Sequence, residues 1–226
     1  VCAAAAALTE LILHGKILMY RKVFRTAGLI AAVGIFCVPV VATAGDTPAL
    51  CATSEQKALI APLYAGSPVP APFMAARKLG LPEAVIASAL PVAQATGVSA
   101  AEFAKVWESL QGWDQALTLV LKGDNVFEIH GRIPPGAPST RSAFFNLKAG
   151  DAGLGGHLRP DLLGAIYAVN LKGPEGPMRG VTFMDQKGEG VFGVYLPESR
   201  EPSPAQVAQF DQTQALMAAM PRICQP

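Results

Sequence analysis

The sequence predicts an α+β protein whose mostly antiparallel sheet is flanked by helices, with an N-terminal helical lobe that resembles a helix-turn-helix. Three observations predict this class. Helical patterns occupy residues 54–110, β-branched and apolar runs with turn signals dominate residues 116–196, and a long helical pattern begins at Ser203. Helices and strands that are segregated along the chain in this way are typical of α+β folds.

The first 44 residues are predicted to be a leader outside the fold, with a signal peptide that starts at Met19. Residues 19–25 are positively charged, residues 29–41 form an apolar run too short for a comfortable membrane span, and residues 42–44 (Ala-Thr-Ala) resemble a cleavage site. The alternative is an uncleaved N-terminal anchor. A cleaved leader predicts a periplasmic or secreted protein with no stable membrane span.

The charge of the remaining chain argues against nucleic acid as a partner. Four of the 18 Lys and Arg residues and one of the 17 Asp and Glu residues lie in the leader, so residues 45–226 carry a formal charge of −2. The helix-turn-helix-like pattern carries only Arg77 and Lys78 near its turn. We therefore predict a packed helical lobe and no DNA binding.

Two cysteines remain outside the leader, Cys51 and Cys224, one near each end of the domain. In an oxidising compartment such a pair predicts a disulfide, and two free thiols near the chain ends are the alternative. Two cysteines cannot complete a zinc site by themselves.

The helical lobe and the helix that follows it have recognisable start and stop signals. Ser54 is a candidate N-cap for the first helix, and the turn at residues 80–82 (Gly-Leu-Pro) separates two short helices within residues 73–91. Ser99, with Glu102 at the capping-box position, predicts a helix over Ala100–Leu110. Its apolar face is expected to comprise Phe103, Val106, Trp107 and Leu110.

A hairpin opens the sheet. The runs 116–121 and 126–130 flank Lys-Gly-Asp-Asn, which is a hairpin signature. A turn is expected at 133–136 and a further strand at 142–147. On this strand Phe144 and Phe145 would point to opposite faces, so one of them is core.

The last third of the domain is expected to mix helix and strand. Pro160 predicts the start of a helix that runs through Val169, because proline suits the first turn of a helix. Strands are expected at 181–184 and 191–196, around a turn at 185–190. The terminal helix should begin at Ser203-Pro204, with apolar positions Val207, Phe210, Leu216 and Met217.

The histidines suggest a ligand site. His157 lies among glycines in FFNLKAGDAGLGGHLRP (residues 144–160), and His130 ends a predicted strand. One or two histidine ligands suit haem better than zinc, and Arg159 is the nearest candidate to hold a propionate. Two further arginines close in sequence could contribute, Arg132 and Arg141. The alternatives are a structural turn residue for His157 and a satisfied strand-end histidine for His130.

Nucleophilic and acid–base catalysis are poorly supported. The sequence contains no GxSxG motif and too few histidines for a Ser-His-Asp assignment. Asp151 and Asp161 flank His157, but such carboxylates more often cap turns and helices.

Several motifs in fixed order resemble a known family. They are ALP, KVW, GW, VFE, FFNL and GHLRP, followed by the hairpin GVTFMDQKGEGVFGVYL and a long terminal helix. Together they resemble the ChuX/HutX haem-utilisation carrier proteins over roughly residues 58–218. On this basis residues 45–57 are a lead-in, residues 58–220 a ChuX/HutX-like domain, and residues 221–226 a tail.

The resemblance implies a homodimeric, non-catalytic protein that holds haem for transfer or storage. The family's haem-associated GHIRP histidine falls on His157, which becomes the proposed iron ligand. A second haem-associated histidine of the family falls on Leu121, and a histidine before the FFNL strand falls on Ser142. Two alternatives stay open: a non-haem structural or interaction protein on the same fold, and a haem-degrading enzyme.

Overall fold

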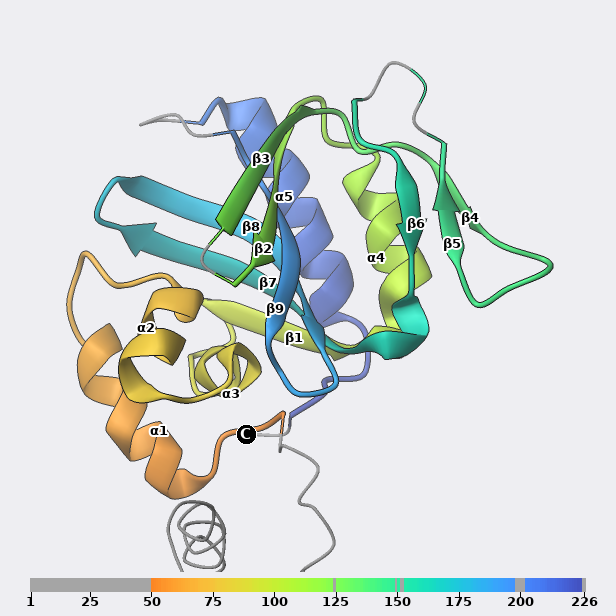
Figure 1. Cartoon of the computed structure of the whole chain (residues 1–226). Coiled ribbons are helices and arrows are strands. Elements are labelled where there is room, and N and C mark those ends of the chain that lie inside the picture. The colour runs from red at the N-terminus through yellow and green to blue at the C-terminus, as the bar shows by residue number, and fades with distance from the viewer. Residues whose placement is uncertain (1–49, 124, 149, 151–152, 198–201, 225–226) are drawn as a thin grey trace, which may run out of the picture. The chain divides into compact units, whose positions relative to one another are not determined.

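A six-stranded antiparallel sheet in the order β1-β7-β8-β9-β2-β3 organises the domain (Figure 1). The computed structural model describes residues 50–123, 125–148, 150, 153–197 and 202–224. Helices pack on both faces of this sheet, which confirms the predicted α+β class. The predicted leader and its cleavage site lie outside the described residues.

The predicted helical lobe covers one face of the sheet. It comprises α1 (Ser54–Ile60), the 3₁₀ turn η1 (Ala61–Tyr64), α2 (Pro72–Leu79) and α3 (Glu83–Ser88). The N-cap of α1 is Thr53 rather than Ser54, because Thr53 and Gln56 form a reciprocal capping box. Gly80 ends α2 in the left-handed conformation at φ 65°, as the Gly-Leu-Pro signal predicts.

The opposite face is covered by α4 (Phe103–Leu110) and α5 (Pro204–Ala218). The four apolar residues predicted to share a face of α4 are all buried. Residues 100–102 form a separate 3₁₀ turn, η2 (Ala100–Glu102), so the α-helix starts later than predicted. In α5, Phe210 and Met217 face the core, whereas Leu216 is 40% exposed because its position turns away from the sheet.

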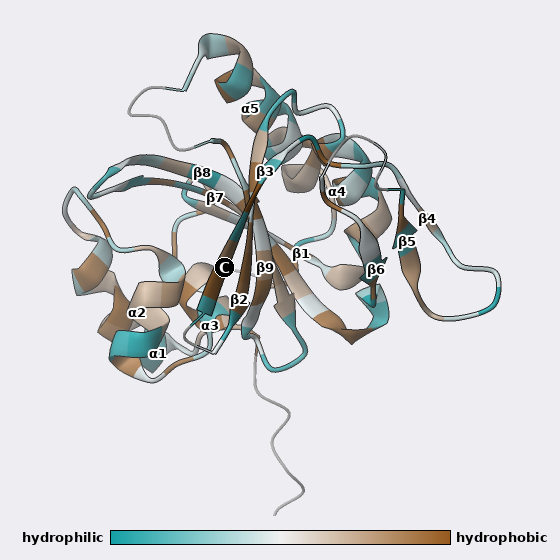
Figure 2. Ribbon diagram, turned by 45° about the horizontal axis from the view of Figure 1, so that its top comes forward, coloured by the Kyte–Doolittle hydropathy of each residue, from teal (hydrophilic) through white to brown (hydrophobic). Residues whose placement is uncertain are grey.

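The predicted hairpin and closing strands are present. The hairpin comprises β2 (Ala116–Lys122) and β3 (Asn125–Gly131), and the closing strands are β8 (Gly176–Asp185) and β9 (Gly190–Tyr195). The strand β3 lies at one edge of the sheet (Figure 1). Figure 2 shows that hydrophobic residues are frequent along the strands of this sheet. Those that face the helices belong to the two hydrophobic cores, one on each face.

The helix predicted from Pro160 through Val169 is wrong. Pro160 opens only the short 3₁₀ turn η3 (Pro160–Leu162), and the chain then continues as the longest strand, β7 (Leu163–Gly173). This strand lies between two neighbours and is buried on both faces, so its apolar run lacks the alternation that identifies an ordinary strand. Its neighbour β1 (Ala95–Ser99) was not predicted at all.

A second, three-stranded sheet packs beside α4. It comprises β4 (Gly136–Pro138), β5 (Phe145–Leu147) and β6 (Gly156–Leu158). The strand predicted at 142–147 is therefore shorter than expected. The expected turn at 133–136 leads directly into β4. His157 lies on β6 rather than in a turn. Phe145 is buried against Phe103 and Trp107, whereas Phe144 is 40% exposed, so the expected alternation of the two rings is confirmed.

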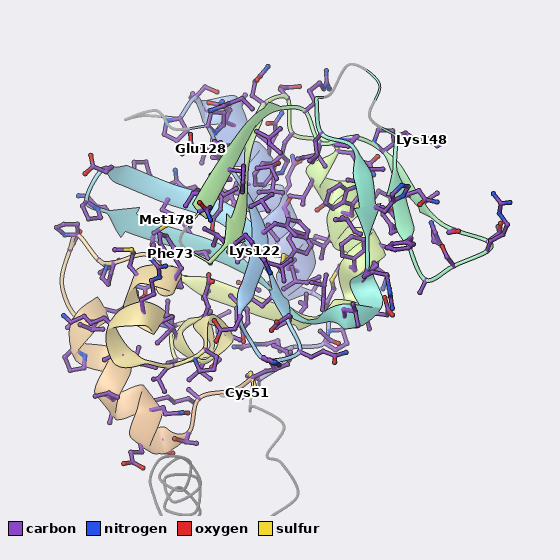
Figure 3. The ribbon with its side chains drawn as sticks, viewed as in Figure 1. Cys51, Phe73, Lys122, Glu128, Lys148 and Met178 are labelled. Atoms are coloured by element: carbon purple, nitrogen blue, oxygen red, sulfur yellow. A yellow bond between two sulfur atoms is a disulfide. The ribbon has the colours of Figure 1, made fainter. Side chains whose placement is uncertain are left out.

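The two ends of the described chain are joined. Cys51 and Cys224 form the predicted disulfide, whose first cysteine is labelled in Figure 3. Residue 222 also bridges to Val98 in β1. Among the helices of the described residues, none combines the length and the apolar character needed to cross a membrane.

Candidate functional site

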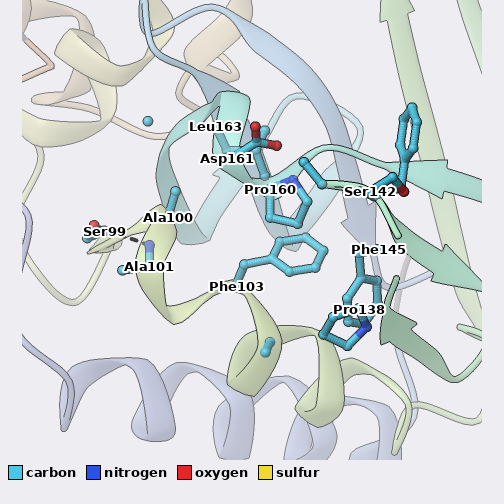
Figure 4. Close-up of a pocket in the computed structure, with 14 residues that line it drawn as sticks. Ser99, Ala100, Ala101, Phe103, Pro138, Ser142, Phe145, Pro160, Asp161 and Leu163 are labelled. Atoms are coloured by element: carbon cyan, nitrogen blue, oxygen red, sulfur yellow. Dashed lines mark hydrogen bonds between the residues drawn. The ribbon is translucent and has the colours of Figure 1, made fainter. Parts of the chain in front are cut away.

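An apolar groove of about 590 Å³ lies between η2, the loop that follows β4, and η3. Its walls include the rings of Phe103, Phe144 and Phe145 together with Pro138 and Pro160, as Figure 4 shows for most of these residues. Few polar side chains reach it, among them those of Ser142 and Asp161. Its size falls within the range of ordinary small-molecule sites, and its walls suit a flat apolar ligand.

Four side chains gather on the outer face of the three-stranded sheet beside this groove. Strand alternation places Asn146 of β5 and Phe144, which directly precedes that strand, on the same side as His157 of β6 and Arg159, which directly follows β6. We call these four residues the outer-face cluster. The Phe144 ring also lines the groove, so the cluster and the groove share a wall.

Direct contacts join the members of the cluster. The ring centroids of Phe144 and His157 are 5.7 Å apart, and the guanidinium carbon of Arg159 lies 5.6 Å from the centroid of Phe144. His157 Nδ1 is 2.7 Å from Asn146 Oδ1. The cluster therefore presents an imidazole, an aromatic ring and a cation on one exposed surface.

Arg159 is held by its own neighbour. Its Nε and Nη2 donate to the two oxygens of Asp161 at 2.8 and 2.6 Å. These hydrogen bonds and the charge of Arg159 lower the pKa of the Asp161 carboxyl below its usual value. Arg159 keeps further N–H donors on Nη1 and Nη2, because an arginine has five.

His130 lies on a different sheet from His157. It occupies the edge strand β3 opposite Leu117, its side chain is 65% exposed, and its Nε2 is 4.0 Å from a carboxylate oxygen of Glu128. The two other arginines that the sequence suggested also lie outside the cluster. Arg132 is 3.9 Å from Asp114, and Arg141 is on the exposed loop between β4 and β5.

Leu121 lines a second groove, of about 600 Å³, between the helical lobe and the β2–β3 hairpin. Glu83 lies in the same groove and is only 5% exposed. Burial, and to a smaller extent the charge of Glu189, raise the pKa of Glu83 to about 7. Leu121, the position to which the motif resemblance assigns a second histidine, therefore lines a different groove from the one beside His157.

Sequence reasoning missed Asn146 and Glu83. Asn146 had a signal, since it lies within the quoted FFNL motif, but its pairing with His157 depends on a strand register that no local pattern gives. Nothing in the local sequence singles out Glu83, because carboxylates are common in the first turn of helices. Its burial arises from packing of the lobe on the sheet.

The described residues do not form a metal site built from several protein ligands. No group of three or more His, Cys, Asp or Glu residues there could hold a metal ion. A single histidine suits haem, because the macrocycle supplies most of the iron ligands and the protein needs to add only one or two. His157 fits that requirement.

The family model for haem utilisation ChuX/HutX matches residues 96–213, more than half of the chain. The chain belongs to the ChuX/HutX family. The match spans α4, the apolar groove beside His157 and the whole outer-face cluster, but only the hairpin side of the second groove. The resemblance inferred from the motifs is thereby confirmed.

A curated member of the ChuX/HutX family is 30% identical over 155 residues, which are 67% of this chain and 78% of the relative. It is the intracellular heme transport protein HutX of Vibrio cholerae serotype O1. The predicted periplasmic or secreted location is contradicted by this relative, which is described as intracellular. That prediction rested on residues 1–44, and these lie outside the described residues.

Solved structures agree on the fold. The chain is 27% identical to protein AGR_C_4470 of Agrobacterium tumefaciens, with a TM-score of 0.62 over 72% of this chain and 92% of that protein. The heme-binding protein ChuX is 21% identical, with a TM-score of 0.61 over 72% of this chain and 98% of ChuX. At that identity the likeness to ChuX shows the fold alone.

Proposed function

We propose that this protein binds haem and carries or stores it, without making or breaking bonds in the macrocycle. Family membership supports this, as does the description of HutX as a heme transport protein. The observation that carries the proposal in this chain is the outer-face cluster. It places His157 beside an exposed aromatic ring and a cation, at the rim of an apolar groove.

Each member of the cluster suits one part of a haem. His157 is the proposed axial ligand, because a neutral imidazole nitrogen is a common ligand of haem iron. Phe144 offers a flat apolar surface to the macrocycle. Arg159 is the proposed partner of a haem propionate. It would donate from the N–H groups that Asp161 does not use, or release the Asp161 carboxylate and bind the propionate in its place.

His130 was the second candidate ligand. Its place on β3, in the other sheet and beside Glu128, gives it no contact with the outer-face cluster among the described residues. The proposed binding within one chain therefore rests on His157. His130→Ala serves as the matched control for His157→Ala, since both remove an exposed imidazole from a strand.

A carrier and a haem-degrading enzyme differ in what happens to bound haem. The protein should be loaded with hemin, reduced in air, and then mixed with an apoprotein acceptor such as apomyoglobin. A carrier passes on intact haem, seen as the full spectrum of the reconstituted acceptor. Loss of the Soret band with biliverdin-like products would refute the carrier role and support degradation.

We infer further that the protein pairs with a second copy of itself, as the family resemblance implies. The edge strand β3 supports a pairing surface, because no described strand pairs with its outer edge and Val126 and Phe127 are 53% and 58% exposed. The mass of the purified protein measured by light scattering should be twice that of one chain. Phe127→Lys should yield monomers, with Lys122→Ala on the neighbouring strand as the control. A wild-type protein that is monomeric at micromolar concentration would overturn this inference.

A further inference from the structure

We propose that Asn146 is a positioning residue for His157, which selects the imidazole tautomer that can bind iron and holds the ring in place. The inference rests on the proposed function, because it takes His157 as the ligand. It adds Asn146, a residue to which the sequence motifs gave no role. Its structural half, the choice of tautomer, can be judged in the haem-free protein.

The strand register brings the two residues together. Asn146 and His157 are the central pair of the antiparallel ladder between β5 and β6, and both side chains point to its outer face. On the inner face the flanking pair Phe145 and Leu158 faces the core, where Phe145 packs against Phe103 and Trp107. The buried inner pair therefore fixes the register that places Asn146 opposite His157.

The contact has a defined chemical consequence. The 2.7 Å separation joins His157 Nδ1 to the carbonyl oxygen of the Asn146 amide, which can only accept a hydrogen bond. Nδ1 must then carry the proton. A neutral imidazole has one ring proton, so Nε2 keeps its lone pair and is the nitrogen available to iron. Without the acceptor, the proton is free to occupy Nε2 and block it.

The same contact restrains the ring. The imidazole is held on one edge by Asn146 and lies 5.7 Å from the Phe144 ring. Asn146 lies on β5 and Phe144 immediately precedes that strand, so both constrain His157 from one side, while the His157 side chain remains exposed. Outer partners of this kind orient metal-binding histidines and increase their basicity, and their loss typically costs about 10–100-fold in metal affinity.

The first test uses the haem-free protein at about pH 8, where an ordinary histidine is neutral. Nitrogen-15 NMR of the imidazoles should show that His157 in wild type is protonated on Nδ1 and unprotonated on Nε2. Asn146→Leu should shift this population toward Nε2–H, and Asn146→Asp, which retains an acceptor oxygen, should restore it. His130 serves as the internal reference and should not change. A wild-type His157 protonated on Nε2, or a tautomer unaffected by Asn146→Leu, would overturn the inference.

The second test measures hemin affinity in the same variants. Asn146→Leu should weaken hemin binding by roughly tenfold or more, and Asn146→Asp should stay close to wild type. Equal losses in both variants would mean that the residue acts through folding, and would overturn the inference. If instead His157→Ala changes neither spectrum nor affinity, the ligand assignment of the proposed function fails. The NMR result then still decides whether Asn146 sets the tautomer.

Discussion

Trp113 Nε1 donates a hydrogen bond to Thr213 Oγ1 at 3.1 Å, and both side chains are 1% exposed. This contact ties the start of the β2–β3 hairpin to the middle of α5, across 100 residues of sequence. Thr213→Val keeps the shape of the side chain but removes the acceptor. The buried indole N–H then has no partner, and we expect unfolding free energy to fall by about 1–3 kcal/mol.

Denaturant unfolding monitored by tryptophan fluorescence measures this loss. Thr213→Ser is the matched variant, because it retains the hydroxyl and loses only a methyl group. The indole N–H resonance of Trp113 should move in the valine variant and stay in the serine variant. A valine variant as stable as wild type would show that this hydrogen bond contributes nothing net.

The buried carboxyl of Glu83 predicts a pH dependence of stability. Its folded pKa of about 7 lies above the ordinary glutamate range, so the folded protein retains a proton that the unfolded chain has lost. Stability is then greatest below about pH 4.5 for this group and falls as the pH rises to about 7. The loss is on the order of 3 kcal/mol.

Several groups lie near Glu83. Glu189 on the β8–β9 turn, Tyr64 of η1 and Tyr195 of β9 interact with its charge, and Arg77 of α2 lines the same groove. Glu83→Gln replaces the carboxyl with a neutral side chain of the same size. Thermal unfolding between pH 5 and 8 should therefore show a flatter profile in this variant and higher stability than wild type at pH 8. A profile with the wild-type slope would assign the titration to another group.

The disulfide between Cys51 and Cys224 closes a loop with a sequence separation of 173 residues. On the chain-entropy account, a loop of this length is worth up to about 5 kcal/mol. The double variant Cys51→Ser, Cys224→Ser should unfold at lower denaturant concentration than the oxidised protein. Reduced wild type should match the double variant, and no difference between oxidised and reduced wild type would contradict the prediction.

Local signals in the sequence were sufficient for much of the fold. Caps, glycine turns and a helical apolar period identified the helical lobe, α4 and α5, and turn residues identified the β2–β3 and β8–β9 hairpins. These features depend on neighbours within a few residues. Family motifs then supplied the class of protein, which composition and spacing had left open.

The failures have a common cause in long-range pairing. Leu163–Gly173 reads as a helix after Pro160 because its neighbour β1 is distant in sequence, and a strand buried on both faces does not show the alternation of an ordinary strand. The outer-face cluster failed to emerge for the same reason. Phe144 and His157 lie in one sequence segment, but only the register of β5 against β6 places His157 directly opposite Asn146.

The central claim is that the chain binds haem through His157, and a hemin titration of the purified full chain tests it most directly. We predict a shifted Soret band that saturates at one hemin per chain. The band should change position and the affinity should fall in His157→Ala, whereas His130→Ala should match wild type. A wild-type protein that gives no shifted, saturable Soret band would contradict the account, and so would a His157→Ala variant indistinguishable from wild type.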